Sequence, residues 1–383
     1  MPTPTSYRFG TGRYLHDQHI LELTGSEVAR YGTRALVVAG PTAWSATNGR
    51  VAASLDAAGI PYQLDLYAGF PSQRKVDELL AALNQGEREA RDEIDARAAT
   101  PAATPAPAAD RPVVVAVGGG KIMDLCKAVA FAAGLPIVAI PTSAATCACF
   151  SPLSVMYTDE GKCVEYRHYD YELNAVLVDD AVMAAQPPRL LAAGIMDAMA
   201  KCIEIANGKP AITLEEDGIA TYSAYRMAQD VYQVLEAHGM QACADLEHKR
   251  PTRTLHDVTF ACIALTGIVS AIMRAKGQTA VAHRLYESLR THYFRQTIDY
   301  LHGEIVATGL FAQLEYNRNP QAIEPLARFM RAAGMPLTLA DLGLDPTDDV
   351  MEHLTSTICG TESVPDEPAA RAALRTALEA IRC

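Results

Sequence analysis

The stretch "VVVAVGGGKIMDLCKAV" (residues 113–129) constrains the fold most, because it joins a β-branched apolar run to three glycines and a helical pattern. It predicts a buried strand, a tight turn and a helix. Gly118, Gly119 and Gly120 would let the backbone approach a bound group closely. The helix N-terminus beyond them would offer free N–H groups and a positive dipole end. A pyrophosphate suits such a turn, but the pattern is not GxGxxG, and a tight turn without a ligand stays open.

The segments around this turn alternate between strand and helix patterns. Continuous apolar strands that alternate with helices indicate a parallel sheet covered on both faces. We therefore expect an α/β, Rossmann-like N-terminal domain. Its expected strands are 34–40, 62–67, 112–120 and 136–142, and its expected helices are 45–60, 72–85 and 121–134.

Strand signals fade from about Asp180 onward, and apolar residues recur there at helical spacing. A chain of 383 residues is long for one core. We predict two domains, an α/β dinucleotide-binding domain (1–180) and an all-helical metal-binding domain (181–383). Residues 86–112 are charged and then rich in Ala, Thr and Pro, which is typical of a flexible surface insertion. The helices expected in the second domain are 188–208, 217–239, 257–275, 279–294 and 302–317.

Charge and composition limit the kinds of partner that we expect for this protein. The formal net charge is −12 and the basic residues are scattered, which argues against nucleic acid or an anionic membrane as the main partner. We expect that no apolar run reaches the length needed to span a bilayer, and the N-terminus lacks a signal-peptide pattern. The nine cysteines form no CxxC pair, which indicates reduced thiols rather than disulfides or a cysteine zinc site. We expect a cytoplasmic protein with a small-molecule substrate.

Three side chains stand out as possible metal ligands. Asp197 lies in the apolar helical segment "LLAAGIMDAMAKC", where an acid is costly unless it is paired or metal-bound. His283 lies in another apolar helix, and His302 begins a third. One Asp and two His would leave an open position, as catalytic metal sites do. Spacing alone does not show that they converge, and each histidine taken singly fits a core or capping role better than a ligand role.

Several motifs together resemble one family. "AVGGGKIMDLCKAVA", "IPTSAATCACFSPLSVMYTDEG", "VLVDD", "LLAAGIMDAMAK", "AVAH" and "LHGEIVATG" occur in the order and spacing of the metal-dependent, or iron-containing, alcohol dehydrogenase superfamily. The resemblance covers nearly the whole chain except residues 86–112. It is closest to the glycerol dehydrogenase-like branch. Within that branch, "PTSAATCACFSPLSV" is more similar to the bacterial hydroxycarboxylate (2-oxo acid) dehydrogenases.

The resemblance implies a dehydroquinate synthase-like fold with an active site between the two domains. It assigns a divalent metal, Zn²⁺ before Fe²⁺ by affinity, to Asp197, His283 and His302. It also implies NADPH or NADH, and we expect a homo-oligomer. Residues that match the family's nucleotide-binding positions are Gly40, Gly118, Gly119, Gly120, Lys121, Asp124, Thr142, Thr146, Ser151, Leu153, Val155 and Tyr157.

Departures from the family pattern shape the expected specificity. Gly40 replaces the Asp that meets the adenosine ribose in glycerol dehydrogenase, so we expect NADPH to be accepted at least as well as NADH. Cys147 replaces the Asp that contacts the polyol, which would favour an anionic substrate. Arg274 and Lys276 replace an acidic segment and could hold a carboxylate or point to solvent. Tyr286 replaces a second histidine and could serve proton relay or substrate fit.

We therefore expect a metal-dependent NAD(P)H oxidoreductase that reduces a small 2-oxo acid or related carbonyl compound, with Cys147 beside the metal ligands in the catalytic site. A glycerol or polyol dehydrogenase is the nearest alternative. A dehydroquinate-synthase-like cyclase, which is a lyase, shares the architecture, but the "HGE" element and Asp197 favour the dehydrogenase. A non-catalytic member is the third alternative, since the segment before His283 departs from the family pattern.

Overall fold

A computed structural model describes residues 9–83, 111–209, 211–274 and 277–382. The chain divides into two compact units. One unit contains Thr11–Thr142 and Ala148–Met183, and the other contains Ser143–Cys147 and the described residues from Ala184 onward. The insertion predicted at 86–112 lies outside the described residues except for its last two, and Pro112 already begins strand β4.

A six-stranded sheet forms the first unit, in the order β1-β8-β5-β4-β2-β3, and its neighbouring strands are parallel. The predicted parallel sheet is confirmed. An antiparallel hairpin, β6–β7, accompanies it. The strands are β1 (Tyr14–Asp17), β2 (Arg34–Ala39), β3 (Tyr62–Leu66), β4 (Pro112–Gly118), β5 (Ile137–Pro141), β6 (Leu153–Tyr157), β7 (Cys163–His168) and β8 (Ala175–Asp179).

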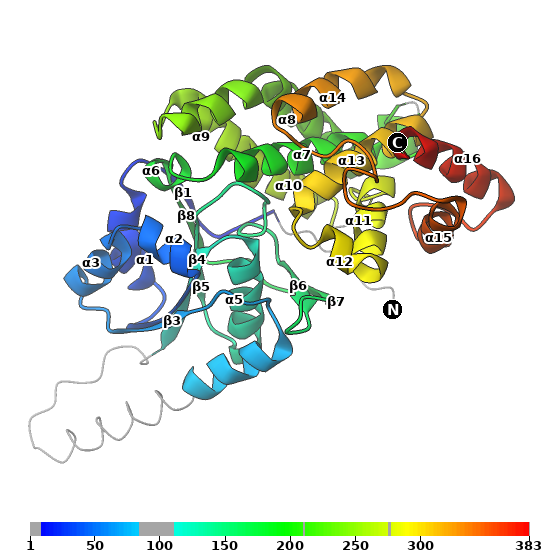
Figure 1. Ribbon diagram of the computed structural model, residues 1–383. Coiled ribbons are helices and arrows are strands. Elements are labelled where there is room, and N and C mark those ends of the chain that lie inside the picture. Colours follow the sequence, from blue (N-terminus) through cyan, green and yellow to red (C-terminus); the bar gives the residue numbers. More distant parts are fainter. Residues whose placement is uncertain (1–8, 84–110, 210, 275–276, 383) are drawn as a thin grey trace, which may run out of the picture. The chain divides into compact units, whose positions relative to one another are not determined.

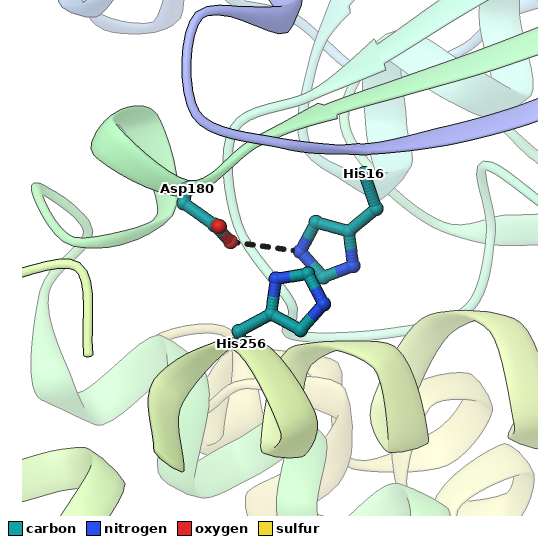
Figure 2. Close-up of side chains that lie close together, drawn as sticks. All are labelled: His16, Asp180 and His256. Carbon is teal, nitrogen blue, oxygen red and sulfur yellow. Dashed lines mark ion pairs between the residues drawn. The ribbon is translucent and has the colours of Figure 1, made fainter. Parts of the chain in front are cut away.

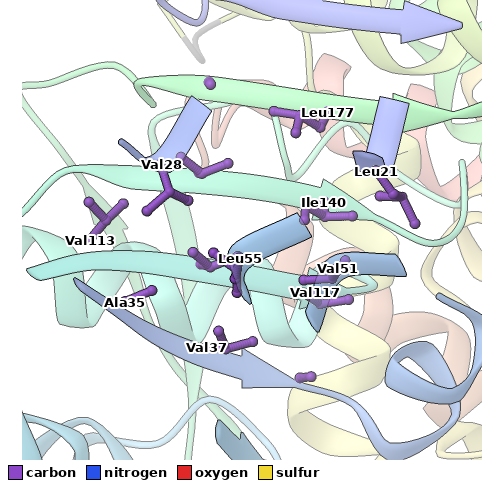
Figure 3. Packing of buried hydrophobic residues seen from close by; sticks show 14 of the residues in the cluster. Leu21, Val28, Ala35, Val37, Val51, Leu55, Val113, Val117, Ile140 and Leu177 are labelled. Atoms are coloured by element: carbon purple, nitrogen blue, oxygen red, sulfur yellow. The ribbon is translucent and has the colours of Figure 1, made fainter. Parts of the chain in front are cut away.

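Helices cover both faces of this sheet (Figure 1). On one face, Leu21, Val28, Val51 and Leu55 pack against strand residues such as Val117, and these side chains are fully buried (Figure 3). Continuous β-branched strands suit this double burial. The helices of the unit are η1 (Ile20–Leu23), α1 (Thr24–Val28), α2 (Pro41–Ala46), α3 (Arg50–Ala57), a helix over residues 73–83, α5 (Gly120–Ala133) and α6 (Asp180–Met183).

Several local features differ from the expectations, and strands β1 and β8 were not among the expected strands. The helix expected over 45–60 is split into α2 and α3, because Asn48 and Gly49 adopt left-handed backbone angles, with φ of 50° and 73°. Such angles interrupt a right-handed helix. The hairpin β6–β7 was not anticipated. Its strands are joined by a turn that contains Gly161, which has a φ of 94°.

The second unit is helical, as expected, and its described residues add one isolated bridge between Thr361 and Val364. Its elements are α7 (Pro188–Ile205), α8 (Leu214–Glu247), α9 (Arg253–Phe260), the π-helix η2 (Ala261–Leu265), α10 (Thr266–Ile272), α11 (Val281–His292), α12 (Phe294–Thr297), α13 (His302–Tyr316), η3 (Pro320–Ala322), α14 (Ile323–Ala332), α15 (Asp348–Ile358), α16 (Pro368–Leu378) and η4 (Glu379–Ile381).

One continuous helical stretch, Arg253–Ile272, is long and apolar enough to cross a membrane by length and composition, with a mean hydropathy of 1.7. This corrects the expectation that no apolar run reaches that length. Buried core helices share this property, and 56% of the most apolar window is buried within the protein. The stretch is therefore weak evidence for a membrane span.

Candidate metal centre and nucleotide-binding edge

The three candidate ligands converge within the helical unit. Asp197 comes from α7, His283 from α11 and His302 from α13. The Nε2 atoms of both imidazoles lie 3.4 Å from Oδ1 of Asp197. One ligand atom from each residue lies within 4.8 Å of the other two. Oδ1 itself is buried and accepts no hydrogen bond from the described residues. A buried carboxylate oxygen without a donor is a natural place for a cation.

Close helix packing brings these ligands together. A Cβ at Gly303 would lie 2.0 Å from the carbonyl oxygen of Ala193 on α7, and a Cβ at Gly309 would lie 2.9 Å from Cα of Ala282 on α11. Neither distance leaves room for a side chain. Only glycine permits helix α13 to approach both partner helices this closely, so these glycines place His302 beside Asp197 and His283.

The start of α13 is fixed by Glu304. Its Oε2 accepts a hydrogen bond of 2.7 Å from the backbone N–H of Leu301, which caps the helix immediately before His302. Both carboxylate oxygens also accept hydrogen bonds from Arg189, at 2.6 and 2.7 Å. Arg189 lies at the beginning of α7, so this bidentate pair ties the helix that carries His302 to the helix that carries Asp197.

The start of α11 is fixed by Glu204, a fully buried residue of α7. Its Oε1 accepts hydrogen bonds from the backbone N–H groups of Ala280 (2.6 Å) and His283 (3.0 Å). Its Oε2 pairs with Nδ1 of His283. This contact directs Nε2 of His283 toward Asp197. A carboxylate that orients a histidine in this way is common around metal sites.

Electrostatics keep the carboxylates ionised. Burial raises the pKa of Asp197, but Lys201 and the two imidazoles outweigh it and hold that pKa well below its usual value. Burial likewise raises the pKa of Glu204, and His283 outweighs it, so the net shift is downward. At His283, burial lowers the pKa, but Glu204 and Asp197 together outweigh it, so the net shift is upward. Burial lowers the pKa of His302, which leaves its imidazole neutral and able to donate a lone pair.

This donor set fits a divalent metal. One carboxylate oxygen and two imidazole nitrogens suit zinc or ferrous iron, and three protein ligands leave a position for substrate. The orphaned Oδ1 of Asp197 is the observation in the structure that supports this fit.

Tyr286 lies beside His302, one of the candidate metal ligands. Its ring is edge-on to the His302 ring, with centroids 4.2 Å apart, and only 7% of the residue is exposed. The guanidinium of Arg290 lies 5.7 Å from the centre of the Tyr286 ring. Tyr286 therefore limits the positions open to the His302 imidazole.

Cys147 lies in the same unit as the ligands. Burial raises the pKa of the Cys262 thiol, and Asp197, Cys243 and Cys147 raise it further. The neighbouring Ala144 donates a backbone hydrogen bond of 2.9 Å to Gln186, which holds the segment that contains Thr146 and Cys147. Arg274 follows helix α10 with a left-handed φ of 56°. Lys276 lies outside the described residues.

Several nucleotide-binding candidates of the sheet unit follow the carboxyl ends of its strands. The backbone N–H of Gly40, after β2, donates to Val117 at 3.1 Å. The N–H of Thr142, after β5, donates to Gly118 at the same distance. Lys121 follows in the first turn of α5, with Nζ 3.7 Å from the centre of the Phe70 ring. Ligands of open parallel sheets bind at this edge.

A buried lysine secures the segment beyond β5. Lys127 of α5 is fully buried, and its ammonium forms an ion pair with Asp124 at 2.9 Å. It also donates to the carbonyls of Ala148 (2.8 Å), Ser151 (3.1 Å) and Leu153. Asp124 in turn accepts a 3.2 Å hydrogen bond from the N–H of Val155. Asp124 thus has a structural role here, and it holds the strand that carries Leu153, Val155 and Tyr157.

Another ion pair of the sheet unit joins its first and last strands. Nε2 of His16 on β1 lies 2.9 Å from Oδ1 of Asp180, which follows β8 (Figure 2). Strands β1 and β8 are neighbours in the sheet, with His16 opposite Val178. The pair therefore reinforces an edge of the sheet.

The chain matches the family described as iron-containing alcohol dehydrogenase over residues 11–180. A glycerol dehydrogenase from Thermotoga maritima is 35% identical over 67% of this chain and 70% of that protein. Hydroxycarboxylate dehydrogenase A from Escherichia coli is 35% identical over 62% of this chain and 64% of that protein. The crystal structure of glycerol dehydrogenase from Schizosaccharomyces pombe has the same fold, with a TM-score of 0.80, 24% identity, and coverage of 99% of this chain and 91% of that one.

This chain belongs to the iron-containing alcohol dehydrogenase family, and it is an oxidoreductase of that family. The crystal structure of sulfoacetaldehyde reductase from Bifidobacterium kashiwanohense, which was solved in complex with NAD⁺, has the same fold, with a TM-score of 0.70 and 17% identity.

Two residues that support the candidate metal site were not predicted from the sequence. Lys201 and Glu204 follow Asp197 in the same helix, and both are nearly or fully buried. Their positions, one and two turns after Asp197 in an otherwise apolar segment, put all three on one helix face. A charged face on a buried helix was the signal that could have revealed them.

Proposed function

We propose that this chain is a cytoplasmic, homo-oligomeric, divalent-metal-dependent NAD(P)H oxidoreductase that reduces a small 2-oxo acid to the hydroxy acid. The convergence of Asp197, His283 and His302 carries the proposal. Zinc is the proposed metal, with ferrous iron as the alternative. The proposal includes the division into a dinucleotide-binding domain (1–180) and a metal-binding domain (181–383).

The chain supplies mainly positioning. A bound divalent metal would polarise the substrate carbonyl while the nicotinamide exchanges a hydride with its carbon. Asp197, His283 and His302 would hold the metal, and Glu204 would keep His283 in the right orientation. Tyr286 would restrict the space beside His302. The turn at Gly118–Gly120 would bind the diphosphate of the nucleotide through backbone N–H groups.

NADPH is proposed as a cofactor at least equal to NADH, because Gly40 offers no carboxylate to a 2′-phosphate. Its backbone is extended, with φ of −67° and ψ of 139°. A Cβ there would meet its nearest neighbour, Cβ of Ala43, at an ordinary 3.5 Å. Backbone geometry therefore does not require glycine, and the missing carboxylate supports acceptance of a charged ribose.

An anionic substrate is favoured by the charges near the ligands. Cys147 replaces the Asp that the resemblance to glycerol dehydrogenases places in this segment. Lys201 adds a positive charge beside the metal residues. A polyol substrate is the second candidate, because several relatives are named glycerol dehydrogenase.

A substrate panel tests the proposal. Purified protein, reconstituted with Zn²⁺ or Fe²⁺, is assayed with simple 2-oxo acids, aldehydes and polyols, each with both nicotinamide cofactors. We expect the highest kcat/KM for a 2-oxo acid. Cys147→Asp should lower that value by at least about tenfold through charge repulsion and raise relative use of a polyol. Cys147→Ser, which is neutral, is the matched control and should leave the order of substrates unchanged.

A wild-type preference for polyols would overturn the 2-oxo acid proposal in favour of the second candidate. An unchanged substrate profile in Cys147→Asp would remove Cys147 from the specificity argument. Absence of any net nicotinamide turnover across the panel would contradict the dehydrogenase proposal itself and favour the cyclase or the non-catalytic alternative.

A further inference from the structure

Lys201 lies near the same atoms that the proposed metal would bind. It lies on α7, one turn beyond Asp197, and 7% of its side chain is exposed. Its Nζ lies 3.2 Å from Nε2 of His283 and 3.8 Å from Oδ1 of Asp197. These are the two atoms that the metal would use, since Nδ1 of His283 is engaged by Glu204.

A buried ammonium requires compensation of its charge. The carboxylate of Asp197 provides it, and Lys201 in turn compensates the buried Asp197. Glu204, the other buried carboxylate of the cluster, pairs with Nδ1 of His283, so each buried carboxylate has a partner from the protein without metal. Oδ1 of Asp197 and Nε2 of His283 would hold a divalent cation, and the ammonium of Lys201 would then be a like charge beside it.

We propose that Lys201 is an internal cation that stabilises the ligand cluster without metal and lowers its affinity for divalent metal. The site would thus remain folded when empty and exchange its metal readily. This inference rests on the metal site of the proposed function. It concerns the strength of metal binding, which neither the fold nor the family relationship assigns.

The test compares metal affinity and thermal stability of full-length variants. Lys201→Met keeps an unbranched side chain and removes the charge, whereas Lys201→Arg keeps the charge. Lys162→Met, at an exposed position of the sheet unit, removes one positive charge elsewhere and is the matched control. Metal-free protein is prepared by dialysis against a chelator. The Kd for Zn²⁺ is then measured by competition with a chromophoric chelator.

Lys201→Met should bind Zn²⁺ at least about tenfold more tightly than wild type. Its metal-free Tm should fall by at least about 3 °C more than its Zn²⁺-loaded Tm. Lys201→Arg and Lys162→Met should stay within about twofold of the wild-type Kd. If Lys201→Met does not fold without metal, Lys201→Gln, which keeps a hydrogen-bond donor, should show the same tightening.

A Kd for both uncharged variants that is equal to or weaker than that of wild type would overturn the inference. A weaker Kd would indicate that Lys201 itself helps to hold the metal. If wild type and every variant fail to bind Zn²⁺ or Fe²⁺, the metal site of the proposed function fails, and the inference fails with it.

Discussion

The residues at the carboxyl edge of the sheet are joined mainly through backbone groups, whereas those of the ligand cluster are joined through side chains. At the edge, Gly40 and Thr142 donate backbone hydrogen bonds to the strand before the glycine turn. In the cluster, Asp197, His283 and Glu204 meet through carboxylate and imidazole atoms. A site built from backbone tolerates change of side chains. A site built from buried charges depends on each partner, because an unpaired charge is costly.

Lys127 is a buried charge beside this backbone-built edge, and its replacement should have the largest effect on stability. Lys127→Met would remove the ion pair of the buried Asp124 and the hydrogen bonds that Lys127 donates to three carbonyls. We expect a loss of about 3–5 kcal/mol in the free energy of unfolding, measured by urea denaturation. Lys162→Met, at an exposed position, should cost less than about 0.5 kcal/mol. If Lys127→Met loses as little stability as Lys162→Met, the buried lysine is not needed for stability.

Glu204→Gln tests the side-chain site directly. The amide would lose the charge that pairs with Nδ1 of His283, and it cannot replace both accepting oxygens. We expect the Kd for Zn²⁺ to weaken by about 10–100-fold. Glu247→Gln, at an exposed position of α8, should leave the Kd unchanged. An unchanged Kd in Glu204→Gln would mean that helix packing alone orients His283.

Gly40→Asp tests the backbone site and should have the smallest effect. The extended backbone at this position admits an Asp, whose carboxylate would repel a 2′-phosphate. We expect kcat/KM for NADPH to fall by several-fold relative to NADH, on the order of 1 kcal/mol. Gly40→Asn has nearly the same size without the charge and should change the ratio little. Equal effects of the two variants would point to steric rather than electrostatic discrimination.

The same contrast explains what the sequence reveals. The strand, turn and helix around the three glycines are encoded locally, by an apolar run, by the glycines themselves and by apolar residues at helical spacing. These elements could therefore be predicted within a few residues. The Asn48–Gly49 dipeptide was a sequence signal that the helix expected over 45–60 breaks there, because Asn and Gly readily adopt the left-handed angles that the structure shows. In the helical unit, Asp197 was conspicuous as an acid in an apolar helix. Its convergence with His283 and His302 depends on packing between distant helices, which spacing does not encode.

Glu204 and Lys201 show the limit most clearly. Glu204 and His283 are 79 residues apart in the sequence, and their contact exists only once α7 and α11 pack together. The close approach at Gly303 and Gly309 is equally tertiary in origin. The resemblance to the family supplied the ligand set, and the structure supplied the residues that hold it in place.

Metal content of the purified protein tests the central claim most directly. After overexpression and gel filtration, elemental analysis should find about one zinc or iron per chain once the protein is loaded. Asp197→Ala should contain less than about a tenth of that amount, because the oxygen on which both imidazoles converge is removed. Chelator-treated wild type should lose its dehydrogenase activity and regain it with added metal. Stoichiometric metal in Asp197→Ala, or full activity of the metal-free wild type, would contradict the account.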